Sequence, residues 1–277
     1  MRRHRMLSTV ARALTALVVL GVATFPIYWM LVTSTMPSSD LFTTRPRLLP
    51  DPSGIAIYLQ AIRSSTVLRW IGNSALVAAG TSTLSVVVAM FAAYALSRYR
   101  FRGRSPFGFA LFVTQMMPEA LLVVPLYGLF LTLGLLNHLY GLVLVNAAFT
   151  MPILVWILKA AIDRVPDEIE EAARIEGCSI LGVQMTIVWP LVAPSIAASA
   201  VIAFFHGWNE YLFATTFIED SARWPASVGL ASFVGELTTP LDQVMAVALV
   251  YATPAIVFFL LAQRWVVSGL AGGAVKE

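Results

Sequence analysis

Long apolar runs that contain no charged residue dominate the chain. Asp, Glu, Lys and Arg are absent from residues 13–39, 70–97, 120–158, 177–209 and 243–263. An α-helix needs about 20 apolar residues to cross the hydrocarbon core of a bilayer. The pattern therefore predicts an all-α integral membrane protein. The six membrane-spanning helices are expected at about 13–32, 70–96, 107–133, 140–162, 190–214 and 241–267.

Polar positions inside the predicted spans mark candidate sites. Pro118 and Pro125 interrupt the third span, and such breaks are tolerated where protein or water covers the freed backbone groups. Ionisable groups at this depth usually face a cavity or a partner. The residues predicted to line a translocation path are Gln115, Glu119, Asn209 and Glu210. Two alternatives stay open: Glu210 could be exposed at the outer interface, and Asn209 could form a hydrogen bond between helices. His206 is expected to pack on a mostly apolar helix.

Composition and the distribution of charge agree with a membrane location. The chain is 58% hydrophobic and 12% charged, whereas soluble domains carry about 25% charged residues. Thirteen of its 18 Lys and Arg residues lie in the N-terminal tail, residues 98–104, residues 159–174 and the C-terminal end. The positive-inside rule places these segments, and with them both termini, in the cytoplasm. Residues 33–65, rich in Pro, Ser and Thr, are then an outside loop with one short helix.

Two other interpretations of the basic residues are weaker. The N-terminal arginines and the first apolar run could form a signal peptide, but the run exceeds the ~7–15 residues of a signal core and lacks a small-residue cleavage site. The arginines at 98–104 could bind nucleic acid, but between two spans they more often anchor topology. We therefore expect neither cleavage nor a nucleic-acid partner.

The sequence contains no constellation of residues for catalysis or metal binding. Its single cysteine, Cys178, and three scattered histidines offer no metal-ligand spacing. It has no HExxH, G-x-S-x-G or G-x-x-x-x-G-K-[ST] motif and no paired acids in two spans. We expect no catalytic residue, no metal and no cofactor on this chain. Residues 1–277 show no internal repeat and no separate soluble domain, so they are expected to form one transmembrane domain powered by another chain.

The segment 163–189, between the fourth and fifth spans, carries six of the chain's 15 acidic residues. Pro166 suits a first helical position, and Asp167 and Glu168 favour the positive end of a helix, so a helix is predicted over 166–176. The expected ridge of small side chains on one face consists of Ile169, Ala172 and Ala173. The polar residues that flank it are Glu170, Glu171 and Arg174. Such a ridge could enter a groove on another protein, although acids and alanines alone are more typical of an ordinary polar loop helix.

Local signals predict how this helix ends. Gly177 should stop it in the left-handed conformation, and Ser179 should cap a second helix. The second helix would turn Ile180, Val183 and Ile187 inward. The expected result is a helix-turn-helix that projects from the membrane.

The order of residues in this segment resembles a known motif. The EAA loop of ABC importer permeases has the pattern E-A-A, then G, then I-x-L-P. The segment resembles it in Glu171-Ala172-Ala173, Gly177, Ile187 and Pro190, which are separated by three, nine and two residues. Trp189 departs from the pattern, because leucine is usual there.

Three further stretches narrow the resemblance to the carbohydrate-uptake class of type I importers, in particular the maltose-type second permease. They are Met117-Pro118 with Pro125-Leu126-Tyr127, the stretch WNEYLF at 208–213 and the tail GLAGGAVK at 269–276. The final Glu277 departs from the glycine common in that class. The resemblance covers nearly the whole chain and implies the type I permease fold, with six spans and a cytoplasmic coupling helix.

The resemblance also implies roles for individual residues. The coupling helix would dock in a cleft of the ATPase, with Glu171 as the polar contact and Glu170 beside it. Ala172 and Ala173 would be the close-packing face, and Gly177 the turn. The tail residues implied to reach into the ATPase dimer are Gly273 and Lys276.

Partners and function follow from the same resemblance. It implies a heterodimer with a second permease subunit, two cytoplasmic ABC ATPase subunits that bind ATP and Mg, and an extracytoplasmic solute-binding protein. The chain would lie among the lipids of a bacterial inner membrane, and it would not itself be an enzyme. The expected function is alternating-access import of a sugar or related polar solute. The alternative from another class is a secondary transporter driven by ion gradients.

Overall fold

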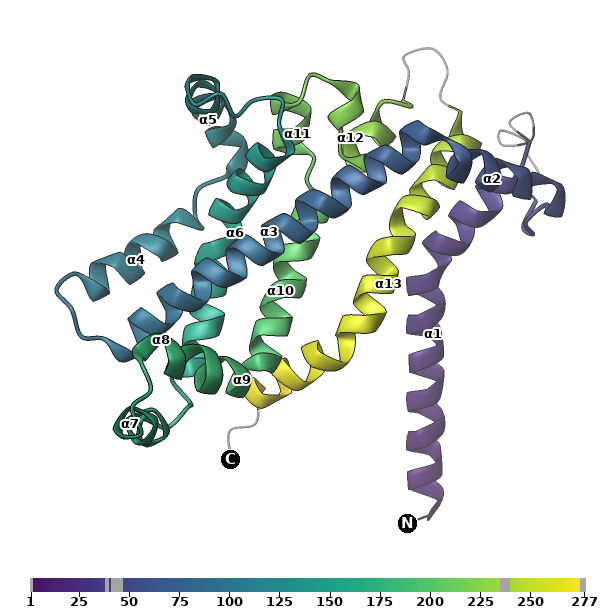
Figure 1. The fold of residues 1–277 in the computed structure, drawn as a ribbon. Coiled ribbons are helices and arrows are strands. Elements are labelled where there is room, and N and C mark those ends of the chain that lie inside the picture. The colour runs from purple at the N-terminus through teal and green to yellow at the C-terminus, as the bar shows by residue number, and fades with distance from the viewer. Residues whose placement is uncertain (1, 38–39, 41–46, 235–239, 275–277) are drawn as a thin grey trace. The chain divides into compact units, whose positions relative to one another are not determined.

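A computed structural model describes residues 2–37, 40, 47–234 and 240–274, with side chains described only within 12–263. Every regular element in these ranges is a helix (Figure 1), in agreement with the all-α prediction. Four helices in the described part are long and apolar enough to cross a membrane. They are α1 (Arg2–Thr35), α3 (Ser65–Arg98), α6 (Leu139–Ile162) and α13 (Leu241–Ala274).

Two further candidate spans are bent. α4 (Arg104–Thr114) and α5 (Glu119–Thr132) meet at an angle of 104°. The segment Ile180–Leu191 meets α10 (Ala193–Trp208) at 83°. If each bent pair is one span, the described residues contain the six spans predicted from the sequence.

Proline residues account for both bends. Pro118 precedes α5 in an extended conformation, with φ −62° and ψ 125°. Pro194, in the first turn of α10, has no N–H to bond the carbonyl four residues earlier. The first break was predicted and the second was not: α10 begins at Ala193, whereas the fifth span was expected to start near residue 190.

The chain divides into two compact units. One comprises residues 1–68 and 230–253, and the other comprises residues 69–229 and 254–277. The expectation that the whole chain acts as one transmembrane domain stays a prediction.

In the first unit, short helices follow α1 within residues 33–65. They are η2 (Pro52–Ile55) and α2 (Ala56–Arg63). The backbone N–H of Asp51 donates to Thr35 Oγ1 at 3.1 Å, and Gly54 lies so close to the Thr35 backbone that a Cβ would not fit. These contacts fix the chain where it leaves α1, whose side chains from Arg12 to Tyr28 are exposed.

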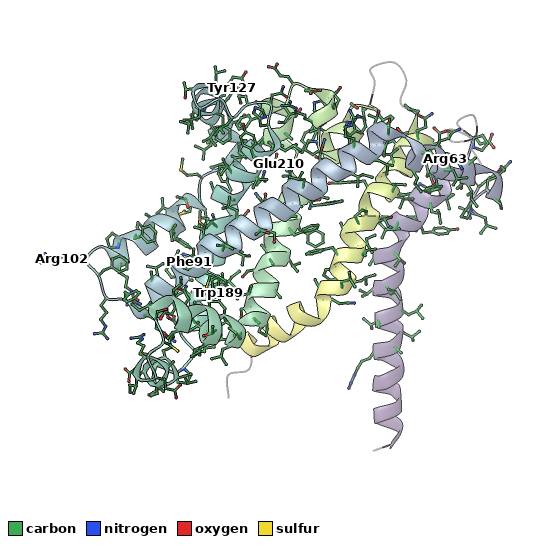
Figure 2. All side chains as sticks on the ribbon, viewed as in Figure 1. Arg63, Phe91, Arg102, Tyr127, Trp189 and Glu210 are labelled. Atoms are coloured by element: carbon green, nitrogen blue, oxygen red, sulfur yellow. The ribbon has the colours of Figure 1, made fainter. Side chains whose placement is uncertain are left out.

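In the second unit, an apolar cluster holds the 163–189 segment against α3 and α6. Its fully buried members include Met90, Leu154, Leu158, Ile162, Val183 and Val188. Trp189, which departs from the leucine of the motif, packs edge-on against Phe91 of α3 with ring centroids 5.7 Å apart (Figure 2). The segment is therefore anchored in the membrane-embedded part of its own chain.

Small residues bring α3 and α10 together elsewhere in this unit. A Cβ on Gly207 would lie 2.9 Å from Ala78 Cα, and Ser82 Oγ donates to the Ala200 carbonyl at 2.8 Å. Close backbone approach of this kind is typical of helix packing in membranes. It fixes the end of α10, where several of the predicted path residues lie.

Candidate functional site

The predicted helix in the 163–189 segment is present as α7 (Asp167–Ile175). Pro166, predicted as the first helical residue, is instead the N-cap, so the helix begins one position later, with Asp167 and Glu168 in the first turn. Gly177 adopts φ +91°, as predicted. The N–H groups of Gly177 and Cys178 donate to the carbonyls of Arg174 and Ala173, each at 3.0 Å. This pair of bonds is a Schellman motif, which requires the left-handed conformation that glycine adopts most easily.

The second helix begins as expected. Ser179 Oγ accepts a hydrogen bond from the Gly182 N–H at 3.1 Å and caps α8 (Ile180–Val183), which continues as the π-helical turn η3 (Gln184–Val188). Val183 is buried and Ile187 packs against the apolar cluster. The prediction for Ile180 was wrong, because it lies beside the exposed turn and is 54% exposed.

The two faces of α7 differ sharply in exposure. Glu170 and Ala173 are buried against the chain's own core, at 1% and 5% exposure. Glu171 and Ala172 are exposed, as are the apolar residues Ile169 and Ile175. The predicted ridge is therefore divided: Ala172 faces outward, whereas Ala173 is turned into the core because the helix must bury one side to stay attached.

The Glu170 carboxylate is the centre of a network that joins α7 to the end of α3. It accepts hydrogen bonds from the Tyr94 hydroxyl and from Arg98 Nε, both at 2.7 Å. Arg174 Nη2 lies 3.6 Å away on the next turn of α7. A buried carboxylate is stable only with such partners, so Glu170 is occupied within its own chain.

The Arg98 guanidinium extends this network to the junction between α6 and α7. Its Nη2 donates to the Val165 carbonyl at 2.7 Å, and its Nη1 lies 3.0 Å from Asp167 Oδ1. From the sequence, Arg98 was expected only to anchor topology, and Tyr94 was not singled out. The available signal was their spacing of four residues at the end of a charge-free run, which places both on one helix face.

A second polar group closes the same junction. Asp163 accepts hydrogen bonds from Ser97 Oγ and Lys159 Nζ, both at 2.6 Å. Burial favours a higher pKa for Asp163, but these hydrogen bonds and the positive charge of Lys159 outweigh it and hold the pKa below 3.8. The carboxylate is therefore ionised at neutral pH and ties the end of α6 to α3.

The break before α5 and the end of α10 meet at a polar cleft. Glu119 begins α5, His206 lies in the last turn of α10, and their Oε1 and Nε2 atoms are 4.0 Å apart. The cleft is lined by Glu119, Ile202, Phe205, His206, Asn209, Glu210, Tyr211 and Leu212. The structure thus brings together three of the four predicted path residues and adds His206, which was expected only to pack.

Gln115 is the predicted path residue that lies apart from the others. It ends α4, and its Nε2 donates to the Phe149 carbonyl of α6 at 3.0 Å. The grooves that it lines are otherwise mostly apolar. Gln115 therefore ties α4 to α6 rather than contributing to the cleft around Glu119.

Glu210 is buried, contrary to the alternative of exposure at the outer interface. It is 6% exposed, and its Oε1 accepts hydrogen bonds from the N–H groups of Phe213 at 2.7 Å and Ala214 at 3.2 Å. These donors belong to the first turn of α11 (Leu212–Phe217). The carboxylate caps that helix and holds the chain in its bent course after α10.

The remaining predicted residues lie at the chain's end. Gly273 is in the last turn of α13, and Lys276 lies outside the described residues. Among the residues that are described, no group of three His, Cys, Asp or Glu side chains could hold a metal ion.

Comparisons with known proteins agree with this arrangement. Residues 85–271 match the family described as "Binding-protein-dependent transport system inner membrane component". The inner membrane ABC transporter permease protein YcjP of Escherichia coli K12 is 32% identical over 92% of each chain. The trehalose transport system permease protein SugB of Mycobacterium tuberculosis is 32% identical over 93% of this chain and 94% of its own.

A solved structure shares the fold. It is the crystal structure of a bacterial ABC transporter involved in the import of the acidic polysaccharide alginate, and one of its chains superimposes with a TM-score of 0.82. The match covers 96% of this chain and 98% of that chain at 21% sequence identity. The fold is therefore that of an ABC importer permease.

These comparisons decide between the alternatives left open by the sequence. The matched family is a transport component rather than an enzyme, and its ATPase activity lies on a separate subunit. Nothing in the comparisons supports a secondary transporter driven by ion gradients. The chain belongs to the inner membrane components of binding-protein-dependent transport systems and is the permease subunit of an ABC importer.

Proposed function

We propose that α7 docks on a cytoplasmic ATPase subunit and transmits its ATP-driven closure to the membrane spans. The observation that carries this proposal is the division of α7 into two faces. Glu170 and Ala173 attach the helix to its own chain, which leaves Glu171 and Ala172 exposed between Ile169 and Ile175. A small residue flanked by apolar side chains and one carboxylate suits close packing in a groove with a polar rim.

The proposed assembly follows from this docking. The 163–189 segment and both termini lie in the cytoplasm, in accord with their basic residues. Two ATPase subunits bind ATP and Mg, a solute-binding protein acts on the opposite side, and a second permease subunit completes a heterodimer. The largely exposed apolar surface of α1 supports contact with that subunit or with lipid. The tail, with Gly273 and Lys276, extends toward the ATPase dimer, and the two units of the chain act as one transmembrane domain.

The proposed solute is a sugar or a related polar molecule that passes the cleft by alternating access. Relatives of this chain are named as permeases for trehalose, for trehalose and maltose, for diacetylchitobiose and for sulfoquinovosyl glycerol. The cleft offers a carboxylate on Glu119, an amide on Asn209 and a phenol on Tyr211. Such groups suit the hydroxyls of a sugar, because each can accept or donate a hydrogen bond at a bend in the span.

The substitution Ala172→Trp tests the docking of α7. Because Ala172 is exposed, the chain can accept the larger side chain, but a close-packed groove on the ATPase cannot. We expect the ATPase to be lost on purification and uptake to fall to background. Arg102→Trp is the matched control, since Arg102 is exposed and points away from the helices (Figure 2). Full ATPase retention and full uptake by Ala172→Trp would show that α7 does not dock.

A further inference from the structure

The network between α7 and α3 assigns a role to residues outside the motif. We propose that Arg98, with Tyr94 and Glu170, is a positioning clamp that makes α3 move with α7. ATPase closure would then move α3 directly, as well as the two helices covalently joined to α7. This inference rests on the proposed docking of α7 and goes beyond it, because docking alone does not say which span receives the motion.

The geometry of Arg98 fits a clamp rather than a single ion pair. Its Nε contacts Glu170 in the middle of α7, its Nη1 contacts Asp167 in the first turn, and its Nη2 contacts the Val165 carbonyl before the helix. One planar group thus holds three successive points on the α7 side. A guanidinium can do so because its five N–H donors are fixed in one plane.

Burial makes this attachment stiff. The side chains of Arg98 and Glu170 are 10% and 1% exposed, and Tyr94 is 2% exposed. Ions in such surroundings are screened little by salt, and separating them would leave an unpaired buried charge. The link should therefore persist when α7 is pulled, whereas an exposed pair would exchange with water.

Neighbouring arginines provide an internal contrast. Arg100 and Arg102 are exposed, and neither forms an ion pair within the described part of the chain. Figure 2 shows Arg102 extending away from the helices. All these arginines satisfy the positive-inside rule equally, so topology alone does not explain why Arg98 is turned inward against α7.

Arg98→Gln, Arg98→Lys and Tyr94→Phe test the clamp in the complete importer reconstituted with its ATPase, second permease and binding protein. The first measurement is the number of ATP molecules hydrolysed per solute imported. The second is the mobility of a spin label on Cys178, which is exposed in the turn that follows α7, recorded without the ATPase. Arg102→Gln is the matched control for loss of a nearby positive charge.

We expect Arg98→Gln to keep the ATPase bound, to raise ATP use per solute about fivefold or more, and to increase label mobility. Arg98→Lys should restore part of the coupling, because lysine keeps the charge opposite Glu170 but cannot hold all three points. Tyr94→Phe should show a smaller increase in ATP use. If Arg98→Gln does not assemble with the ATPase, Tyr94→Phe and Arg98→Lys together test the clamp. Arg102→Gln should match the wild type.

Two outcomes separate this inference from the docking proposal. If Ala172→Trp loses the ATPase but the assembled clamp variants keep wild-type coupling and label mobility, α7 docks and the clamp is wrong. If Ala172→Trp keeps the ATPase and normal uptake, docking itself is wrong, and the clamp as a transmission element is overturned with it.

Discussion

Acidic side chains occur both at the α3–α7 junction and in the cleft between the start of α5 and the end of α10, but their partners differ. Glu170 is buried and bonded to Tyr94 and Arg98 at 2.7 Å. Glu119 is 40% exposed, and its Oε1 lies 4.0 Å from His206 Nε2. A carboxylate whose acceptor positions are filled by its own chain fixes the position of a helix. A carboxylate with free acceptor positions can instead bind a solute. Glu170 is therefore a structural group that attaches α7 to α3, whereas Glu119 is available to a solute.

The largest expected effect comes from breaking the turn that ends α7. Gly177→Pro removes an N–H that bonds the Arg174 carbonyl and forbids the observed φ of +91°. We expect ATP-dependent uptake to fall to background while the subunit still inserts in the membrane, as measured by transport assays and membrane fractionation. Gly72→Ala is the control, since nothing lies within 4 Å of a Cβ there. Normal transport by Gly177→Pro would contradict the importance of this turn.

The adjacent residues Glu170 and Glu171 sharpen the comparison between buried and exposed acids. Glu170→Gln should lower stability by about 2 kcal/mol, because charged hydrogen bonds to Tyr94 and Arg98 are lost. Glu171→Gln should change stability by less than ~0.5 kcal/mol but reduce ATPase binding. Thermal unfolding of the purified subunit and ATPase titration measure the two effects separately. Equal stability of both variants would contradict the assigned burial.

A smaller effect is expected in the cleft. Glu119→Gln removes an exposed carboxylate that could accept hydrogen bonds from solute hydroxyls. The apparent KM for uptake should rise about fivefold, corresponding to about 1 kcal/mol, with ATPase assembly unchanged. Transport kinetics with the native solute give the measurement, and Glu219→Gln, at an exposed position after α11, serves as a control for charge loss outside the cleft. An unchanged KM would contradict the prediction that Glu119 lines the translocation path.

The smallest effect concerns pH. The pKa of Asp163 is lowered in the folded chain despite partial burial, because Lys159 and Ser97 bond the ionised form. Its contribution to stability is therefore present above the unfolded pKa near 3.8 and is lost as pH falls through the lower folded value. Because the side chain is 42% exposed, we expect less than ~1 kcal/mol. The difference in thermal stability between wild type and Asp163→Asn should shrink as pH falls below 4. A difference that does not change with pH would contradict this assignment.

Local rules predicted the ends of the helices but not their faces. Gly177 and Ser179 act through bonds to residues only a few positions away, so their roles could be inferred from spacing alone. Glu170 and Arg98 are 72 residues apart, and nothing in the local pattern indicates that they meet. For the same reason the sequence could not show that Ala173 faces inward while Ala172 faces outward.

The cleft illustrates the same limit. Pro118 indicated the first break, and the polar residues near it and after α10 were identified as candidates. Only the packing of α5 against α11, which follows α10, brings Glu119 to His206, while Gln115 bonds to Phe149 of α6. The capping role of Glu210 likewise depends on the turn between α10 and α11, which the hydrophobic pattern did not predict.

Labelling of Cys178 tests the central claim, that the end of α7 is cytoplasmic and covered by the ATPase. Cys178 is the chain's one cysteine, it is exposed, and it belongs to the Schellman turn. A membrane-impermeant maleimide should miss it in right-side-out vesicles, label it in inverted vesicles, and react more slowly when the ATPase is co-expressed. A denatured sample provides the control for thiol reactivity. Labelling from the outside would contradict the proposed orientation, and unchanged labelling with the ATPase present would contradict docking at this turn.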